Sequence, residues 1–191
     1  MAATLRAFIA IEVPEAVSDS AQKFQERLRQ SGVRARWVRQ GSFHLTLRFL
    51  GDVPEERVGA IAGAMEEAAS VSPPLRLLTH GLGVFPPKGP PKVLWMGLEG
   101  DVERLAALGD ALSDRLESGA GIAKERRPFH AHLTLARFRD RLNRTAVQKA
   151  MEACGSPEPV SFVVESISLF ESRLNPEGAR YIRLASAPLG G

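Results

Sequence analysis

The chain has a single cysteine in 191 residues and no long apolar run. Cys154 alone cannot form an internal disulfide, and such sparing use of cysteine is typical of a reducing compartment, so we expect a cytoplasmic protein. No stretch approaches the roughly 20 apolar residues that cross a bilayer, and no basic leader precedes an apolar stretch at the start. We therefore expect neither a membrane-bound protein nor a signal peptide.

Acidic residues are missing from two arginine-rich windows, residues 31–51 and 126–139. Each window holds four arginines and no aspartate or glutamate, so the rest of the chain is acidic on balance although the whole carries a formal charge of +3. The arginines of the two windows are Arg34, Arg36, Arg39, Arg48, Arg126, Arg127, Arg137 and Arg139. This distribution predicts an anionic ligand, such as phosphate or an oligonucleotide, near both windows.

The tetrapeptide His-Leu-Thr-Leu occurs once in each window, at residues 44–47 and 132–135. With four histidines and five threonines in the chain, composition alone predicts only about 0.1 His-x-Thr pairs. One such pair is more often a polar strand edge than a catalytic site, but two copies with the same leucines need another explanation. The repetition indicates two structural halves with a shared architecture.

Strand periodicity places the functional groups of each motif on one face. His44, Thr46 and Arg48 should share a face, and the same parity puts His132 and Thr134 together on the second strand. The apolar residues of the first strand should be buried on its opposite face: Phe43, Leu45, Leu47 and Phe49. Each strand would then present an imidazole and a hydroxyl about 7 Å apart along the backbone.

Two histidines around one phosphate can perform phosphodiester hydrolysis by in-line attack. One imidazole takes a proton from water while the other delivers a proton to the leaving oxygen, and a side-chain pKa of about 6.5 allows either role near neutral pH. Neighbouring arginines can neutralise charge on the other phosphate oxygens. Because protein groups supply every proton and charge, the pattern predicts no metal and no other cofactor.

The remaining pattern predicts an α+β protein. Bulky apolar residues predict strands at 5–13, 33–39, 43–50, 75–85, 93–98, 128–137, 160–172 and 181–187. Helical spacing predicts helices at 14–30, 54–70, 101–116 and 143–154. Successive strands without an intervening helix favour antiparallel pairing. We therefore expect two mostly antiparallel sheets with flanking helices, related by a pseudo-two-fold axis, each sheet holding one motif strand.

At these residues the chain resembles the RNA 2′,3′-cyclic phosphodiesterases of the two-histidine (2H) phosphoesterase superfamily, once called 2′-5′ RNA ligases. The similarity follows the same order along nearly the whole chain, at residues 6–11, 37–51, 81–95 and 127–137. One position departs from the family pattern, because Ala131 stands where a proline usually precedes the second motif histidine. That change removes no functional group.

The resemblance implies a single bilobal domain over residues 1–191, with a central cleft. The substrate would be RNA or a nucleotide with a 2′,3′-cyclic phosphate terminus, opened to a 2′-phosphate, and reversible ATP-independent 2′-5′ RNA ligation is also possible for such a protein. By the same resemblance, His44 would be the general acid and His132 the general base. Thr46 and Thr134 would hold the phosphate, with help from Arg137. We expect the protein to act as a monomer.

Two other functions remain open from the residues alone. His130 shares a strand face with His132, so these two and His44 could form the zinc site of a metal-dependent hydrolase, although neither threonine would then have a role. A non-catalytic RNA-binding module would use the basic windows but would not need the duplicated imidazoles. Three aromatic residues near the motifs could stack a base or belong to the core: Phe8, Trp37 and Phe129.

Overall fold

The computed structural model describes residues 3–125, 127–139, 141–175 and 178–190. In chain order the elements of these residues are β1 (Thr4–Glu12), α1 (Glu15–Gln30), β2 (Arg36–Trp37), β3 (His44–Pro54), a 3-10 turn η1 (Glu55–Arg57), α2 (Val58–Ser70), β4 (Leu75–Phe85), β5 (Val93–Gly100), α3 (Val102–Ala120), β6 (His132–Arg137), α4 (Arg144–Cys154), β7 (Ser161–Val164), β8 (Ser166–Asn175) and β9 (Gly178–Pro188).

The expected helices and strands are present, but several bounds differ. β3 continues to Pro54 and a 3-10 turn follows it, so the helix expected at 54–70 begins at Val58. β2 covers only two residues of the expected range 33–39, and the range 160–172 is divided into β7 and β8 at Glu165. β6 begins at His132 rather than at Pro128. Pro128 has no backbone N–H to donate to a ladder, and the ladder with β5 begins only at the pair of Gly97 with His132. The second motif histidine therefore stands at the very start of its strand.

A single antiparallel sheet contains the nine strands of the described residues, in the order β7-β4-β5-β6-β3-β1-β8-β9, with β2 paired to β6. The two motif strands, β3 and β6, are central neighbours joined by one ladder pair, Leu45 with Leu133. The α+β class, the antiparallel pairing and the separation of the motifs into two halves are thereby confirmed. The two expected sheets are halves of one sheet, because this single pair continues the hydrogen bonding between them.

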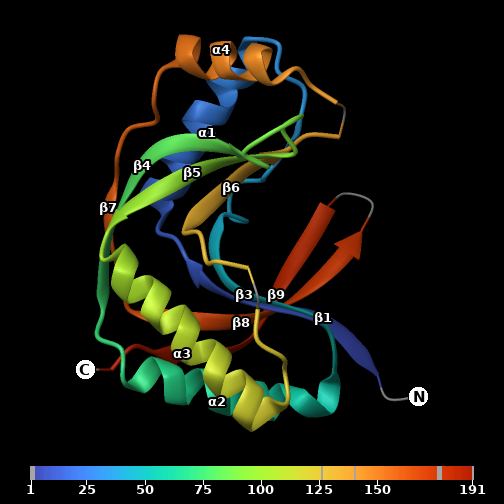
Figure 1. Cartoon of the computed structure of the whole chain (residues 1–191), viewed down its shortest axis with the longest axis vertical. Helices are drawn as coiled ribbons and strands as arrows, with labels where there is room; N and C mark the ends of the chain where they lie inside the picture. Colours follow the sequence, from blue (N-terminus) through green and yellow to red (C-terminus); the bar gives the residue numbers. More distant parts are fainter. Residues whose placement is uncertain (1–2, 126, 140, 176–177, 191) are drawn as a thin grey trace.

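The helices divide between the two halves of the sheet (Figure 1). α1 and α4 contact each other beside β4, β5 and β6, whereas α2 and α3 contact each other beside β1, β3, β8 and β9. The lobes are not consecutive in sequence, since α1 follows β1 and yet packs in the other lobe. None of the helices in the described part of the chain is long and apolar enough to span a membrane.

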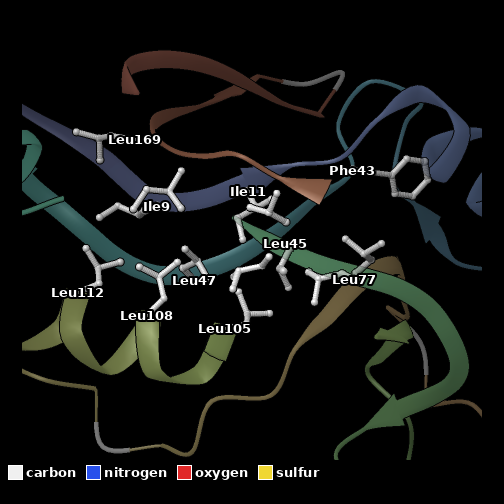
Figure 2. Close-up of a cluster of buried hydrophobic side chains, with 14 of the residues drawn as sticks. Ile9, Ile11, Phe43, Leu45, Leu47, Leu77, Leu105, Leu108, Leu112 and Leu169 are labelled. Carbon is white, nitrogen blue, oxygen red and sulfur yellow. The ribbon is translucent and has the colours of Figure 1, made fainter. Parts of the chain in front are cut away.

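The leucines of the motifs are anchored in the main hydrophobic core. Leu45 and Leu133 are both fully buried. Leu45 and Leu47 of β3 face α3, as Figure 2 shows. The α3 side chains on that side are Leu105, Leu108 and Leu112. Burial of each such side chain stabilises the fold by roughly 1.5–3 kcal/mol, so the backbone that carries the histidines is firmly held.

A β-bulge follows the threonine of each motif. In β3 the register against β1 skips Leu47, and in β6 the register against β5 skips Leu135. Both skipped residues are the second leucine of their tetrapeptide, so the two halves share this irregularity. A bulge of one residue exchanges the two faces of the strand beyond it.

The bulge in β3 makes the expected orientation of two residues wrong. Strict alternation puts Arg48 beside His44 and Phe49 in the core. In the structure Arg48 is only 7% exposed and Phe49 is 48% exposed, because the extra residue reverses both faces. The matching bulge in β6 turns Arg137 toward the face of its own motif histidine, where strict alternation does not put it.

We expect Leu133→Ala to lower the free energy of unfolding by about 2–5 kcal/mol, because it leaves a cavity where the two halves of the sheet meet. Chemical denaturation measures this change. The control is Val163→Ala on β7, where the side chain is 51% exposed and the loss should stay below about 1 kcal/mol. Equal losses for the two variants would contradict the central role of the Leu45–Leu133 pair.

Candidate active site

The two motifs lie side by side at the centre of the sheet. Leu45 pairs with Leu133, so the antiparallel direction of the two strands puts His44 on the side of Thr134 and Thr46 on the side of His132. The paired leucines point into the core, so both imidazoles and both hydroxyls lie on the opposite face. The charge of His132 acts on the pKa of His44, and the charge of Arg137 acts on both histidines, so these groups lie close to one another.

Both motif histidines fix their rings in the same way. His44 Nδ1 is 2.9 Å from the carbonyl oxygen of Ser42, and His132 Nδ1 is 2.7 Å from that of His130. A carbonyl oxygen can only accept, so Nδ1 carries the proton and donates. Nε2 of each neutral ring is then the acceptor, free to take a proton, and it becomes a donor once the ring is protonated.

The pKa of each histidine is lowered, mainly by burial. For His44, desolvation has the largest effect, and the positive charges of Arg137 and His132 lower the pKa further. For His132, desolvation is again the largest cause, followed on the lowering side by His130 and Arg137. The hydrogen bond from each Nδ1 to its carbonyl opposes these effects. Both rings are therefore mainly neutral at neutral pH in the free protein.

Aromatic side chains hold the ring of His44 from two sides. The ring of Phe8 lies 4.9 Å from it, and Tyr181 of β9 contacts it edge-on at 5.0 Å between centroids. Phe8 also stacks on Phe170 of β8, and it is 4% exposed. Phe8 is therefore a wall that orients His44, and it offers no free face to a nucleobase.

His132 has its own aromatic surroundings. Its ring lies edge-on to Phe85 at 5.1 Å and 6.4 Å from the ring of Trp95. His130 packs on the same indole, at 4.8 Å, and it is exposed at the rim of the site. A Cβ at Gly83 would overlap the indole ring, so only glycine lets Trp95 lie in this position. Aromatic rings thus surround both motif histidines. The rings around His44 come from β1 and β9, whereas those around His132 come from β4 and β5.

A cavity of about 690 Å³ opens on the His44 side of the motif pair. Thr46, Trp37 and Tyr181 belong to its wall. Its arginines come from β1, β2, the chain that follows β2, and β6: Arg6, Arg36, Arg39 and Arg137. None of the described residues that line it is acidic, so it suits an anion. Both acid-free windows contribute to it, as their composition predicts.

Two of these arginines face each other directly across a ladder, Arg36 on β2 and Arg137 on β6. Like charges in opposed positions of a sheet are unfavourable, so an anion between them relieves a repulsion. The charges of both arginines act to lower the pKa of the Tyr181 phenol, which shows that the phenol lies close to both of them. Burial has the larger effect and raises that pKa, which keeps the phenol neutral and able to donate a hydrogen bond.

A second cavity, of about 440 Å³, opens on the His132 side. His130 and Phe129 line it, and Thr46 and Phe49 belong to the walls of both cavities. Its charged side chains are of both signs: Arg48, Arg127, Asp110 and Glu125. The two motif histidines therefore face different cavities, with Thr46 between them. The balanced charge of the second cavity suits an uncharged group.

Arg48 ties β3 to the chain segment that leads into β6. Its guanidinium donates a hydrogen bond to the carbonyl oxygen of Ala123. Burial lowers its pKa, and the nearby Glu125 acts in the opposite direction. Arg48 thus has a structural position on the wall of the second cavity, whereas strict strand alternation predicts it beside His44. Of the arginines in the acid-free windows, Arg126 lies outside the described residues.

Four of the five predicted site residues line at least one of the two cavities, and Thr134 is the exception. His44, Thr46 and Arg137 line the first cavity, and His132 lines the second together with Thr46. Thr134 is half-buried on β6 and is not among the described residues that line either cavity. The sequence alone does not predict a role for Tyr181. The only feature that distinguishes this residue in the sequence is that it is the single tyrosine of the chain.

A three-histidine metal site finds no support in the arrangement of side chains. His132 uses Nδ1 to bind the carbonyl of His130, and the two rings are 5.9 Å apart between centroids. Within residues 3–125, 127–139, 141–175 and 178–190, no three His, Cys, Asp or Glu side chains form a group that could hold a metal ion.

Known proteins share both the sequence and the fold. The family model described as LigT like phosphoesterase matches residues 11–95 and 101–181. An RNA 2′,3′-cyclic phosphodiesterase of Aeropyrum pernix is 33% identical over 160 residues, 83% of this chain and 89% of its own. One from Thermotoga maritima is 33% identical over 177 residues, 93% and 91% of the two chains. The crystal structure of a protein from Thermus thermophilus has a TM-score of 0.79 at 28% identity, covering 98% and 99%.

A bilobal antiparallel fold with two adjacent His-x-Thr strands at its centre defines a two-histidine phosphoesterase, which confirms the resemblance seen in the sequence. The family match covers both copies of the motif. The chain belongs to the LigT-like phosphoesterase family.

We expect both His44 and His132 to titrate below the ordinary histidine pKa of about 6.5 in the free protein. Arg137→Met should raise both values, because the charge of Arg137 lowers each of them. Titration of the ring proton resonances by NMR measures the change. Arg137→Lys keeps the charge, and Arg139→Met removes an arginine that affects neither ring, so both should leave the two values nearly unchanged. A shift in only one histidine would show that the rings do not share one site.

Proposed function

We propose that this protein hydrolyses the terminal 2′,3′-cyclic phosphate of RNA or of a nucleotide to a 2′-phosphate. The observation that carries the proposal is the pair of imidazoles on adjacent strands, each with Nδ1 bound to a carbonyl oxygen and each lining its own cavity. The names of the two relatives, both RNA 2′,3′-cyclic phosphodiesterases, support the same substrate. The chain would act as one bilobal domain, since the Leu45–Leu133 pair makes its sheet continuous.

In the proposed reaction the phosphorus lies between the two rings. Nε2 of His132 takes a proton from water as the water oxygen attacks phosphorus. The bond from phosphorus to O3′ breaks on the opposite side, and protonated His44 delivers its Nε2 proton to O3′. The phosphate stays on O2′, so the product is a 2′-phosphate. Each correctly placed acid or base accelerates such a step typically 10²–10⁴-fold.

The remaining side chains of the site would bind the phosphate. The hydroxyls of Thr46 and Thr134 donate to oxygens that take no part in the proton transfers, and the Arg137 guanidinium neutralises charge on them. The substrate also prepares the acid, because its negative charge raises the pKa of a nearby imidazole. Protonation of one ring is thus favoured once the phosphodiester is bound, although burial keeps both rings mainly neutral in the free protein.

We expect His44→Ala and His132→Ala each to lower kcat by about 10²–10⁴-fold on a 2′,3′-cyclic nucleotide, because each removes one proton-transfer group. The assay is run in EDTA, and the product isomer is identified by chromatography. RNA carrying a terminal 2′-phosphate should bind the variants with nearly wild-type affinity. His80→Ala is the matched control, since His80 is exposed on β4 and interacts with Glu99 at 3.3 Å.

Three results would contradict the assignment. Wild-type rates in both motif variants would remove the histidines from the mechanism. Activity that disappears in EDTA and returns with zinc would favour a metal-dependent hydrolase. RNA binding by a wild-type protein that hydrolyses no cyclic phosphate would favour a non-catalytic RNA-binding module.

The second cavity favours an additional activity, the joining of RNA through a 2′-5′ bond. About 440 Å³ beside His132 is far more than the roughly 30 Å³ that one water occupies. A nucleoside with a free 5′-hydroxyl can take the place of that water, and the balanced charge of the cavity suits an uncharged group. His132 then takes the proton of the 5′-hydroxyl, O5′ bonds to phosphorus, and O3′ leaves with the proton from His44.

We expect adenosine in excess over a 2′,3′-cyclic nucleotide to yield a 2′-5′-linked dinucleoside phosphate, detected by mass spectrometry. Gly109→Leu should lower the ratio of transfer to hydrolysis by about tenfold or more, equivalent to 1.4 kcal/mol. Gly109 lines the second cavity on α3, and a Cβ there meets no atom within 4 Å.

Gly59→Leu is the matched control, because Gly59 lies on α2 with the same free space and lines neither cavity. Both substitutions replace a helical glycine by a better helix former, so neither should weaken the fold. Absence of any transfer product at saturating adenosine would contradict the ligation activity and leave the hydrolase standing.

A further inference from the structure

Each motif histidine packs against the edge of one aromatic ring in nearly the same geometry. The ring of Tyr181 lies 5.0 Å from the ring of His44, with an angle of 86° between the two planes. The ring of Phe85 lies 5.1 Å from that of His132, at 85°. The two contacts come from different strands, β9 and β4, and they differ by one hydroxyl group. A phenylalanine is therefore sufficient for such a contact, and the hydroxyl of Tyr181 needs a separate explanation.

The protein itself does not use the hydroxyl of Tyr181. The side chain is half-buried, and its ring also meets the ring of Phe8 edge-on at 5.0 Å. Within the part of the chain that the structure describes, no residue accepts a hydrogen bond from the phenol. A tyrosine hydroxyl near buried side chains usually finds a partner, so this one is available to a ligand.

The phenol lies on the anion-binding side of the site. Tyr181 lines the first cavity together with His44, Arg36 and Arg137. The ring contacts His44, whereas the charges of the two arginines act on the phenol. The hydroxyl is therefore near the two guanidiniums, where an anion bound between them would lie.

We propose that Tyr181 is a further catalytic residue, whose hydroxyl donates a hydrogen bond to a phosphate oxygen that is not bonded to the ribose. The proposal rests on the proposed hydrolysis and adds a neutral donor to the two threonines and Arg137. Of the two outer oxygens of the cyclic phosphate, it concerns the one nearer to Arg36 and Arg137. Donors that are held in place before the reaction stabilise the charge that develops on such an oxygen in the transition state.

The phenol keeps its proton throughout the reaction. Water attacks phosphorus and the bond to O3′ breaks, while both proton transfers remain with His132 and His44. The hydroxyl only stabilises the outer oxygen as negative charge develops on it. Burial raises the pKa of the phenol, so at neutral pH it stays a donor and does not ionise beside the anion.

The experiment compares adenosine 2′,3′-cyclic phosphate with the two isomers of adenosine 2′,3′-cyclic phosphorothioate. Each isomer has sulfur in place of one outer oxygen, and sulfur is a weak hydrogen-bond acceptor. Tyr181→Phe should lower kcat about 10- to 100-fold on the oxygen substrate and on one isomer, the usual loss for one hydrogen bond to a charged group. The other isomer should stay within about threefold of its wild-type rate, because its sulfur has already removed that bond.

Two other patterns would overturn the proposal. Rates within about threefold of wild type on all three substrates would show that only the ring of Tyr181 matters, since phenylalanine keeps the ring. Equal losses on all three would show that the hydroxyl acts on the protein and not on one oxygen. Ser172→Ala is the matched control, because it removes a hydroxyl from the same cavity wall at the residue that pairs with Tyr181. It should change no rate by more than about threefold, since Ser172 lies outside the aromatic group around His44.

Failure of the proposed function gives a different result. If the wild-type protein hydrolyses none of the three substrates, calorimetry with adenosine 2′-phosphate tests the hydroxyl directly. Tyr181→Phe should weaken binding by about tenfold, whereas Ser172→Ala should leave the affinity within about threefold. Equal affinities of the wild-type protein and Tyr181→Phe would then reject the proposal.

Discussion

The pairing of Leu45 with Leu133 is the contact on which the site depends. It is the one ladder pair between the two motif strands, and it joins the halves of the sheet into a continuous surface. Because both leucines point into the core, the groups on either side of them point the other way. A short antiparallel contact therefore assembles two imidazoles and two hydroxyls from segments that lie far apart in the sequence.

Much of this arrangement could be predicted from the sequence, because strand and helix periodicity depends on local residues. The order of elements, the buried leucines and the shared face of His44 and Thr46 follow from that periodicity. The reversal of Arg48 and Phe49 does not, since nothing in the residues around Leu47 indicates a bulge. Tyr181 could not be placed either, because its contact with His44 depends on the pairing of β8 with β9 and of β8 with β1.

The near-symmetry of the site is broken by a small number of side chains. The histidines bind their carbonyls alike, and both strands bulge after the threonine. Five residues after each histidine the halves differ, with Phe49 on one strand and Arg137 on the other. The imidazoles alone give the phosphodiester no preferred direction across the two-fold axis. Under the proposed mechanism the direction of bond cleavage is set by what surrounds them, above all by the arginines on the His44 side.

The facing arginines of β2 and β6 have a cost for the empty protein. Arg36 and Arg137 repel each other across the ladder, and no acidic side chain lines the described wall of their cavity to offset the charge. Both side chains are exposed, so solvent screens much of this repulsion, and replacing either arginine with glutamate would remove it. The same two charges that repel each other in the empty cavity attract an anionic ligand to it. Engineering for heat resistance by balancing surface charge at these positions would therefore weaken the attraction for the ligand.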